Sequence, residues 1–166
     1  MAQAKFDHVA IAVWSIRDAM RLFVDVLGAE YVGGDEEDRL GIRTVQFTLP
    51  PGVKIELMEP LHEESYLHRY LEKHGPGFHH TTLLFDDIEE VIPELEAAGF
   101  DTVGTDLTDA AWRETFTRPS QAFGTLLQLA DTTIDWMEPS DFPVEDVLDG
   151  RVVWNGSERV YREEQQ

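Results

Sequence analysis

An internal repeat is the feature that most constrains how this chain can fold. Three pairs of residues share an offset of 72, namely His8 and His80, Gly52 and Gly124, and Glu56 and Gln128. The offset between Gly28 and Gly99 is 71. An offset that persists along two whole segments indicates a duplicated unit, and it favours two copies of one supersecondary structure.

Both copies show the same order of elements, βαβββ: an opening strand, a helix with apolar residues at helical spacing, and three further strands. In the first copy we expect strands at 6–13, 30–34, 42–49 and 53–59, and a helix between Ser15 and Gly28. In the second we expect strands at 79–85, 101–104, 113–117 and 124–130, and a helix between Asp87 and Gly99. The predicted fold class is therefore α+β, built from two tandem βαβββ modules.

The predicted domain is residues 1–131, with module one at 5–60, a connector at 61–77 that contains a helix near 64–74, and module two at 78–131. Residues 132–166 lie outside the repeat and form a C-terminal extension. Within it, 151–161 is predicted to be a β-hairpin with a two-residue Asn155-Gly156 turn. Because an isolated hairpin is marginal in water, we expect it to dock on the body or on a second subunit.

Composition excludes several functional classes. The formal net charge of −20 disfavours binding to nucleic acid or to anionic membranes. The chain has no cysteine, so disulfides, thiolate metal sites and a cysteine nucleophile are excluded. No apolar run approaches the roughly 20 residues of a membrane helix, and residues 1–5 are too few for a signal peptide before the first strand. A cytoplasmic location is the default expectation.

Strand alternation places one polar residue of each key strand on an open face. In the first strand His8 shares a face with two alanines, Ala10 and Ala12, whereas Val9 and Ile11 should pack on the helix. The same reasoning yields four polar residues on open faces: His8, Glu56, His80 and Gln128. Within each copy, the second of these residues follows the first at the same offset of 48. If a pseudo-twofold axis relates the copies, all four meet, and their nitrogen and oxygen atoms suit a divalent cation.

Simpler explanations exist for each of these residues taken alone. A histidine in a strand is more often a hydrogen-bonded core residue than a metal ligand, and a glutamate is often merely solvated. Their repeat-related positions favour the metal site, and a metal would also offset the cost of burying Glu56. His79 aligns with Asp7 and is interpreted as structural.

The chain resembles the vicinal oxygen chelate superfamily of glyoxalase I, extradiol dioxygenases, bleomycin-resistance proteins and methylmalonyl-CoA epimerases, and it is most similar to the epimerases. The resemblance covers residues 5–131 and lies in four stretches: Asp7–Val13, Lys54–Pro60, Tyr70–His80 and Arg118–Gln128. It implies a cupped mixed sheet around a central cleft, with metal ligands at His8, His80, Gln128 and Glu56. The ion would be a single divalent metal such as Co, Zn, Ni, Mn, Mg or Fe, in a homodimeric protein with a small-molecule substrate.

Two departures from the epimerase pattern bear on the reaction. The last ligand is glutamate in epimerases but Gln128 here, and an amide cannot act as a base. The second epimerase base would fall near Thr44 or Gln46, neither of which takes a proton, so Glu114 in the other copy is the substitute candidate. Glu56 is the only predicted ligand that can act as a base.

The resemblance implies an isomerase or epimerase that acts through an enolate on an acyl-CoA or a small oxo-acid, with Glu56 and Glu114 as catalytic candidates. Three alternatives remain: a glyoxalase I-like lyase, a non-heme iron dioxygenase, and a non-catalytic binding or resistance protein. The presence of both His8 and His80 argues against the last, because such binding proteins use the cleft without a metal.

Overall fold

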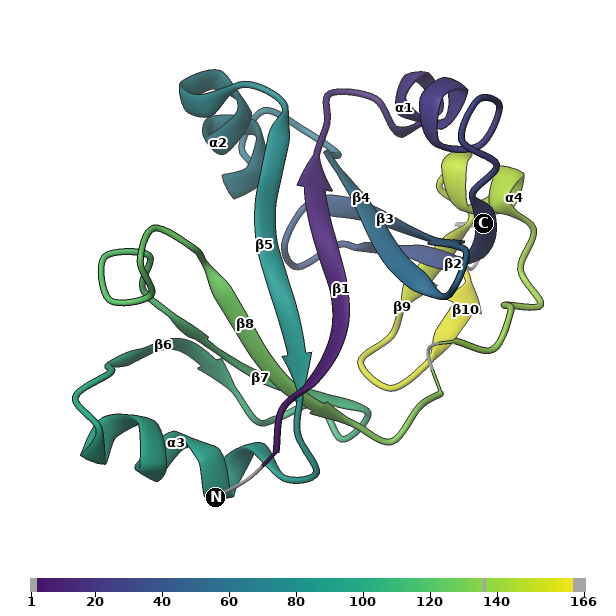
Figure 1. Cartoon of the computed structure of the whole chain (residues 1–166). Helices are drawn as coiled ribbons and strands as arrows, with labels where there is room; N and C mark the ends of the chain where they lie inside the picture. The colour runs from purple at the N-terminus through teal and green to yellow at the C-terminus, as the bar shows by residue number, and fades with distance from the viewer. Residues whose placement is uncertain (1–2, 136, 163–166) are drawn as a thin grey trace. The chain divides into compact units, whose positions relative to one another are not determined.

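The computed structural model describes residues 3–135 and 137–162, which form ten strands and four helices. This confirms the predicted α+β class. The chain divides into two compact units. Unit 1 consists of Met1–Val9 and His79–Asp135, and unit 2 of Ala10–Phe78 and Trp136–Gln166. Strands β1 (Lys5–Ala12) and β5 (Gly77–Leu84) each run from one unit into the other (Figure 1).

Unit 2 contains most of the first repeat together with the C-terminal extension. Its elements are α1 (Ile16–Phe23), β2 (Glu30–Glu37), β3 (Ile42–Leu49), β4 (Val53–Pro60), α2 (Tyr66–His74), α4 (Val144–Leu148), β9 (Val152–Trp154) and β10 (Arg159–Tyr161). The strand order is β10-β9-β2-β3-β4. Strands β2, β3 and β4 are antiparallel, and their register pairs Gly33 with Gln46 and Gln46 with Glu56.

The core of unit 2 corrects one expectation about strand faces. Ala10 and Ala12 are fully buried and pack with Leu67 and Leu71 of α2. The face that they share is therefore closed by the connecting helix rather than left open. Alternation alone could not reveal this, because α2 lies outside the repeat.

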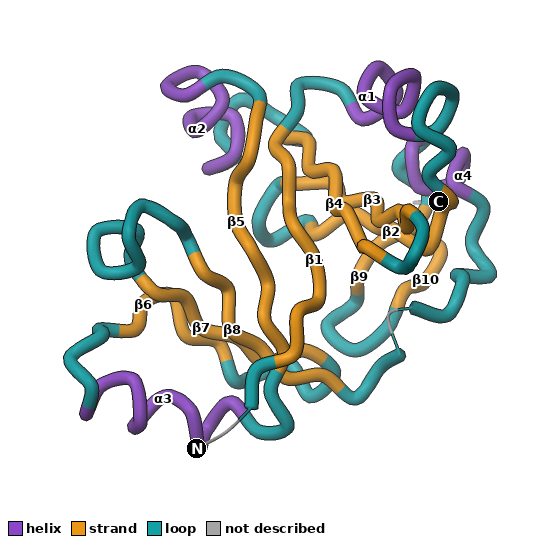
Figure 2. The backbone as a smooth tube through the Cα atoms, viewed as in Figure 1, coloured by secondary structure: helices purple, strands orange, loops and turns teal. Residues whose placement is uncertain are grey.

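Unit 1 contains most of the second repeat. Its further elements are α3 (Ile88–Ala97), β6 (Thr102–Asp106), β7 (Trp112–Thr117) and β8 (Leu127–Thr132), and its strand order is β5-β8-β7-β6. Strand β5 runs parallel to β8, and β8, β7 and β6 are antiparallel. Ile88 and Val91 of α3 pack on Leu129 of β8 to form the core, and Figure 2 shows this helix beside the sheet of its unit.

Three predicted boundaries were wrong, and one of them is the end of β2, which lies at Glu37 rather than at 34. The first helix ends at Phe23, and the chain continues through turns to Gly28, which adopts a positive φ of 72°. The last strand of the second repeat begins at Leu127 rather than at 124, because Phe123 (φ 55°) and Gly124 (φ 91°) form a left-handed turn that breaks the strand.

The C-terminal extension docks on the body, as expected, and does so on β2. Strand β9 pairs in parallel with β2 at Glu36 and Val153, and β10 pairs with β9. The hairpin loop spans 155–158 and is longer than the expected Asn-Gly turn, because the Asn155 side chain accepts hydrogen bonds from the backbone N–H groups of Ser157 and Glu158, both at 3.0 Å. Over residues 3–135 and 137–162, no helix has the length and apolar character needed to cross a membrane.

Candidate functional site

His8 is held by its sequence neighbour. The imidazole lies on β1 with 2% of the residue exposed, and its Nδ1 is 2.6 Å from Oδ2 of Asp7. Because a carboxylate can only accept, Nδ1 carries the proton and donates it. In the neutral ring Nε2 then presents a lone pair, which is the form that binds a metal. In many metal sites, the ring nitrogen of a histidine that does not bind the metal donates a hydrogen bond to a carboxylate, which fixes the orientation of the ring.

His80 is the repeat-related residue on β5, and it is also buried. Its Nδ1 lies 2.8 Å from Nδ1 of His79. The rings of His8 and His80 meet edge to face, with centroids 5.6 Å apart. Unit 1 therefore brings the two predicted histidine ligands together.

Gln128 is linked to His8 through the hydroxyl of Thr82. Thr82 is fully buried on β5, and its Oγ1 donates to Oε1 of Gln128 at 2.5 Å. The same Oγ1 lies 3.0 Å from Nε2 of His8. The imidazole nitrogen and the amide oxygen predicted to be ligands therefore point toward one shared hydroxyl.

Glu114 lies directly beside Gln128. The Gln128 Nε2 donates to Oε2 of Glu114 at 2.6 Å, and the Trp112 indole donates to the same oxygen at 2.8 Å. Two N–H donors thus fix the orientation of the carboxylate. The candidate base of module two is therefore adjacent to the predicted amide ligand.

Glu56 belongs to unit 2, where it lies on β4 with 7% of the residue exposed. Its Oε1 accepts a 3.0 Å hydrogen bond from Nε2 of Gln46 on β3. Thr44 pairs with Met58 two residues further along, on the same face. Neither Thr44 nor Gln46 can take a proton, so Glu56 is the candidate acid-base group among these three residues.

The donor set fits a divalent cation. Unit 1 offers two imidazoles and an amide oxygen, and unit 2 offers the carboxylate of Glu56, all of them buried. Mixed nitrogen and oxygen ligands of this kind suit borderline or hard divalent ions. The meeting of all four ligands stays a prediction.

Sequence reasoning missed three supporting residues: Asp7, Thr82 and Gln46. Asp7 and His79 each precede a candidate ligand and each contact its Nδ1, and they are related by the repeat offset of 72. That shared offset was a signal that His79, interpreted only as structural, has a place beside the site. Gln46 was noted only as a position that lacks a base, and its hydrogen bond to Glu56, like the contacts of Thr82, depends on side-chain contacts across strands.

Comparison with known families agrees with this geometry. The sequence model described as the Glyoxalase/Bleomycin resistance protein/Dioxygenase superfamily matches residues 7–117. An ethylmalonyl-CoA/methylmalonyl-CoA epimerase of Cereibacter sphaeroides is 35% identical over 102 residues, which are 61% of this chain and 75% of that protein.

An uncharacterized protein of Bacillus subtilis is 36% identical over 91 residues, which are 55% of this chain and 64% of that protein. The match to this bacterial relative thus spans just under two thirds of its length. Among solved structures, methylmalonyl-CoA epimerase from Mycobacterium tuberculosis superimposes with a TM-score of 0.70 at 30% identity, covering 78% of this chain and 88% of that one. A hypothetical protein from Bacillus halodurans gives a TM-score of 0.74, also at 30% identity, covering 80% of this chain and 97% of that one.

Proposed function

Because this chain belongs to the glyoxalase/bleomycin resistance protein/dioxygenase superfamily, we propose that it is a metal-dependent isomerase or epimerase. Its substrate is an acyl-CoA or a small oxo-acid with an acidic C–H next to a carbonyl. The similarity to methylmalonyl-CoA epimerases supports this class of reaction. The observation that carries the proposal is the series of close contacts from His8 through Thr82 and Gln128 to Glu114, which links candidate ligands to a candidate base.

The proposed ligands are His8, His80, Gln128 and Glu56. Asp7 would keep the His8 ring in the tautomer that binds a metal. The approach of Glu56 from unit 2 to the histidines is part of the proposal. When bound, a divalent ion would polarise the substrate carbonyl and stabilise the negative charge that develops on its oxygen.

The protein's own residues would move the proton. The carboxylate of Glu56 takes the proton from the carbon next to the carbonyl, and the electron pair of that C–H bond delocalises onto the carbonyl oxygen. Glu114, in its protonated form, returns a proton to the same carbon from the opposite side, which inverts the centre. Gln128 cannot replace either group, because an amide neither takes nor gives a proton in this way.

Hydrogen exchange in deuterated water tests this proposal. Metal-loaded protein incubated with methylmalonyl-CoA should exchange the acidic C–H, as followed by NMR. Glu56→Gln keeps an oxygen for the metal but loses the base, so exchange should fall by about 10²–10⁴-fold. Elemental analysis of the same sample checks that the metal is retained.

Glu63→Gln is the matched control, because Glu63 is exposed on the loop before α2. It should exchange at the wild-type rate. Full exchange in Glu56→Gln would move the base to Glu114, whose Gln variant is tested in parallel. If metal-loaded wild-type protein exchanged neither methylmalonyl-CoA nor small oxo-acids, the enzyme proposal would give way to a non-catalytic binding protein.

A further inference from the structure

An amide from the neighbouring strand contacts the carboxylate of Glu56. Gln46 on β3 pairs directly with Glu56 on β4, and residues paired in this way project on the same side of the sheet. Nε2 of Gln46 lies 3.0 Å from Oε1 of Glu56, and each residue is 7% exposed. Because an ionised carboxylate only accepts hydrogen bonds, the NH2 group must be the end of the amide that faces Glu56. The contact therefore fixes both the amide and the carboxylate oxygen that it engages.

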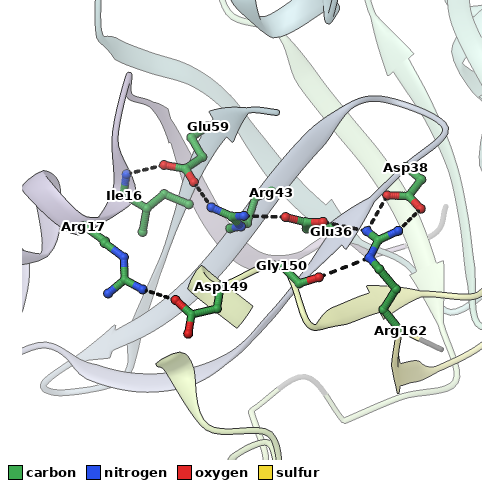
Figure 3. Close-up of polar contacts among 9 residues, drawn as sticks. All are labelled: Ile16, Arg17, Glu36, Asp38, Arg43, Glu59, Asp149, Gly150 and Arg162. Atoms are coloured by element: carbon green, nitrogen blue, oxygen red, sulfur yellow. Dashed lines mark hydrogen bonds and ion pairs between the residues drawn. The ribbon is translucent and has the colours of Figure 1, made fainter. Parts of the chain in front are cut away.

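The two strands that carry this contact are cross-linked on their other face. Arg43 and Glu59 are also paired on β3 and β4, and they lie three residues from Gln46 and Glu56, so they project on the opposite side. Their side chains form an ion pair, and Arg43 also pairs with Glu36 on β2 (Figure 3). None of these three side chains is more than 15% exposed. A buried ion pair between β3 and β4 keeps the strands in register, which sets the spacing across which Gln46 reaches Glu56.

Gln46 is also confined on the side away from Glu56. Its other partner in the register is Gly33 on β2. A Cβ atom placed on Gly33 would lie 2.6 Å from Nη1 of Arg159, so this guanidinium occupies the space where a side chain at 33 would lie. The guanidinium on one side and the hydrogen bond to Glu56 on the other restrict the rotamers of Gln46. All of these residues belong to unit 2.

A purely structural role explains Gln46 less well. Over residues 3–135 and 137–162, its Oε1 is buried and accepts no hydrogen bond, and its one side-chain hydrogen bond is the donation to Glu56. A buried carbonyl oxygen without a donor costs stability, whereas an apolar side chain of the same length would carry no such cost. What the amide contributes is therefore directed at Glu56.

We propose that Gln46 is a positioning residue that holds the carboxylate of Glu56 in the orientation in which it binds the metal. The inference rests on the proposed function, in which Glu56 is a metal ligand as well as the base. With Oε1 engaged by the amide, the plane of the carboxylate is set, and so is the direction in which Oε2 points. Groups that orient a metal ligand through a hydrogen bond control metal affinity without touching the metal.

Metal affinity tests the inference without depending on turnover. Gln46→Met keeps the length of the side chain and removes the donor, so the affinity for Co²⁺ should weaken by about 10–100-fold in a titration with a competing chelator. The visible absorption spectrum of the Co²⁺-loaded protein should also change, because it reports the arrangement of the ligands. Thr48→Val is the matched control, since Thr48 is the next residue of β3 on the same face, and both readouts should stay at wild-type values.

A double-mutant cycle shows whether Gln46 acts through Glu56. Glu56→Met removes the carboxylate, and adding Gln46→Met to it should weaken Co²⁺ affinity no further. The double variant replaces both partners of the hydrogen bond by apolar side chains, so its metal-free form should melt close to the metal-free wild type. Gln46→Asn keeps an amide but withdraws it from Glu56 by one methylene. It should weaken affinity as Gln46→Met does, and it serves as the test if Gln46→Met does not fold.

Two results would overturn the inference. One is wild-type affinity and spectrum in the Gln46 variants, and the other is a loss in the double variant equal to the sum of the two single losses. If either result came with methylmalonyl-CoA exchange in the wild type, the role of Gln46 would be wrong and the proposed function would stand.

Failure of the proposed function has a different signature. If the wild type bound Co²⁺ but exchanged neither methylmalonyl-CoA nor small oxo-acids, the proposed reaction would be wrong, and the cycle would still measure the effect of Gln46 on Glu56. If the wild type bound no divalent metal, both proposals would fall together.

Discussion

Glu59 and Asp131 hold equivalent positions in the two repeats, related by the offset of 72, and each caps a helix from the end of a strand. Glu59 accepts a 2.6 Å hydrogen bond from the backbone N–H of Ile16, and Asp131 accepts one of 2.8 Å from that of Ile88. Both bonds span 43 residues. At this position a carboxylate accepts a hydrogen bond from a backbone N–H in the first turn of the helix and interacts favourably with the positive end of the helix dipole. Each carboxylate therefore holds its helix against the strand that carries it.

Removing the Asp131 charge should destabilise the fold. The carboxylate is buried and also accepts from Nε of Arg113 at 2.9 Å, so Asp131→Asn weakens a charge-assisted pair and a helix cap together. We expect a loss of about 1.5–3 kcal/mol in the free energy of unfolding, measured with denaturant. Asp86→Asn, at an exposed pair with Lys5, is the control and should change little. Equal effects of the two substitutions would contradict this account.

Metal removal should lower the melting temperature. The proposed ligands come from both repeats, so binding favours the folded state by mass action, about 2.7 kcal/mol when free metal is 100 times its dissociation constant. Thermal unfolding before and after chelation measures this, with metal content determined in both samples. His8→Ala should make the protein insensitive to chelator. An unchanged melting temperature after verified removal would count against ligands that join the repeats.

Asp7 is expected to set metal affinity through His8. Asp7→Asn keeps the size of the side chain but removes the charge that orients the ring at 2.6 Å, so affinity should weaken by about 10–100-fold. A metal titration with a competing chelator measures the change. Asp18→Asn on α1 is the control, because Asp18 is exposed. Wild-type affinity in Asp7→Asn would exclude this supporting role.

Tyr31 should make stability fall at alkaline pH. Burial raises its pKa from 10.0 to about 12, and its hydroxyl donates to the carbonyl of Phe142 in the extension at 3.0 Å. Because the folded pKa is raised, the stabilising contribution is complete below the unfolded pKa and is lost as pH rises through the folded one. The stability advantage over Tyr31→Phe should thus be constant below about pH 9 and shrink toward about pH 12. If the difference in stability between wild type and Tyr31→Phe stayed constant up to about pH 12, the raised pKa of Tyr31 would be refuted.

The repeat made the α+β fold class and the strands of both modules predictable, because a constant offset aligned weak local signals with one another. It also selected His8 and His80, which the structure brings together. Features outside the repeat could not be predicted in the same way. The burial of Ala10 depends on α2, and the position of Arg159 over Gly33 joins segments from opposite ends of the chain. Neither contact leaves a periodic trace in the sequence.

Deleting residues 140–166 should change how the protein behaves in solution. The deletion uncovers the edge of β2 that pairs with β9, and it removes Val147 and Val152, both of which are fully buried. An open strand edge next to newly exposed apolar surface favours association with other chains. Light scattering should therefore show a higher mass or aggregation for the shortened protein, while circular dichroism checks that it remains folded. Arg151→Gln is the control, because it removes a charge of the extension at an exposed side chain and leaves the strands paired. A shortened protein that stays folded, with the mass and solubility of the full chain, would show that the extension does not protect this edge.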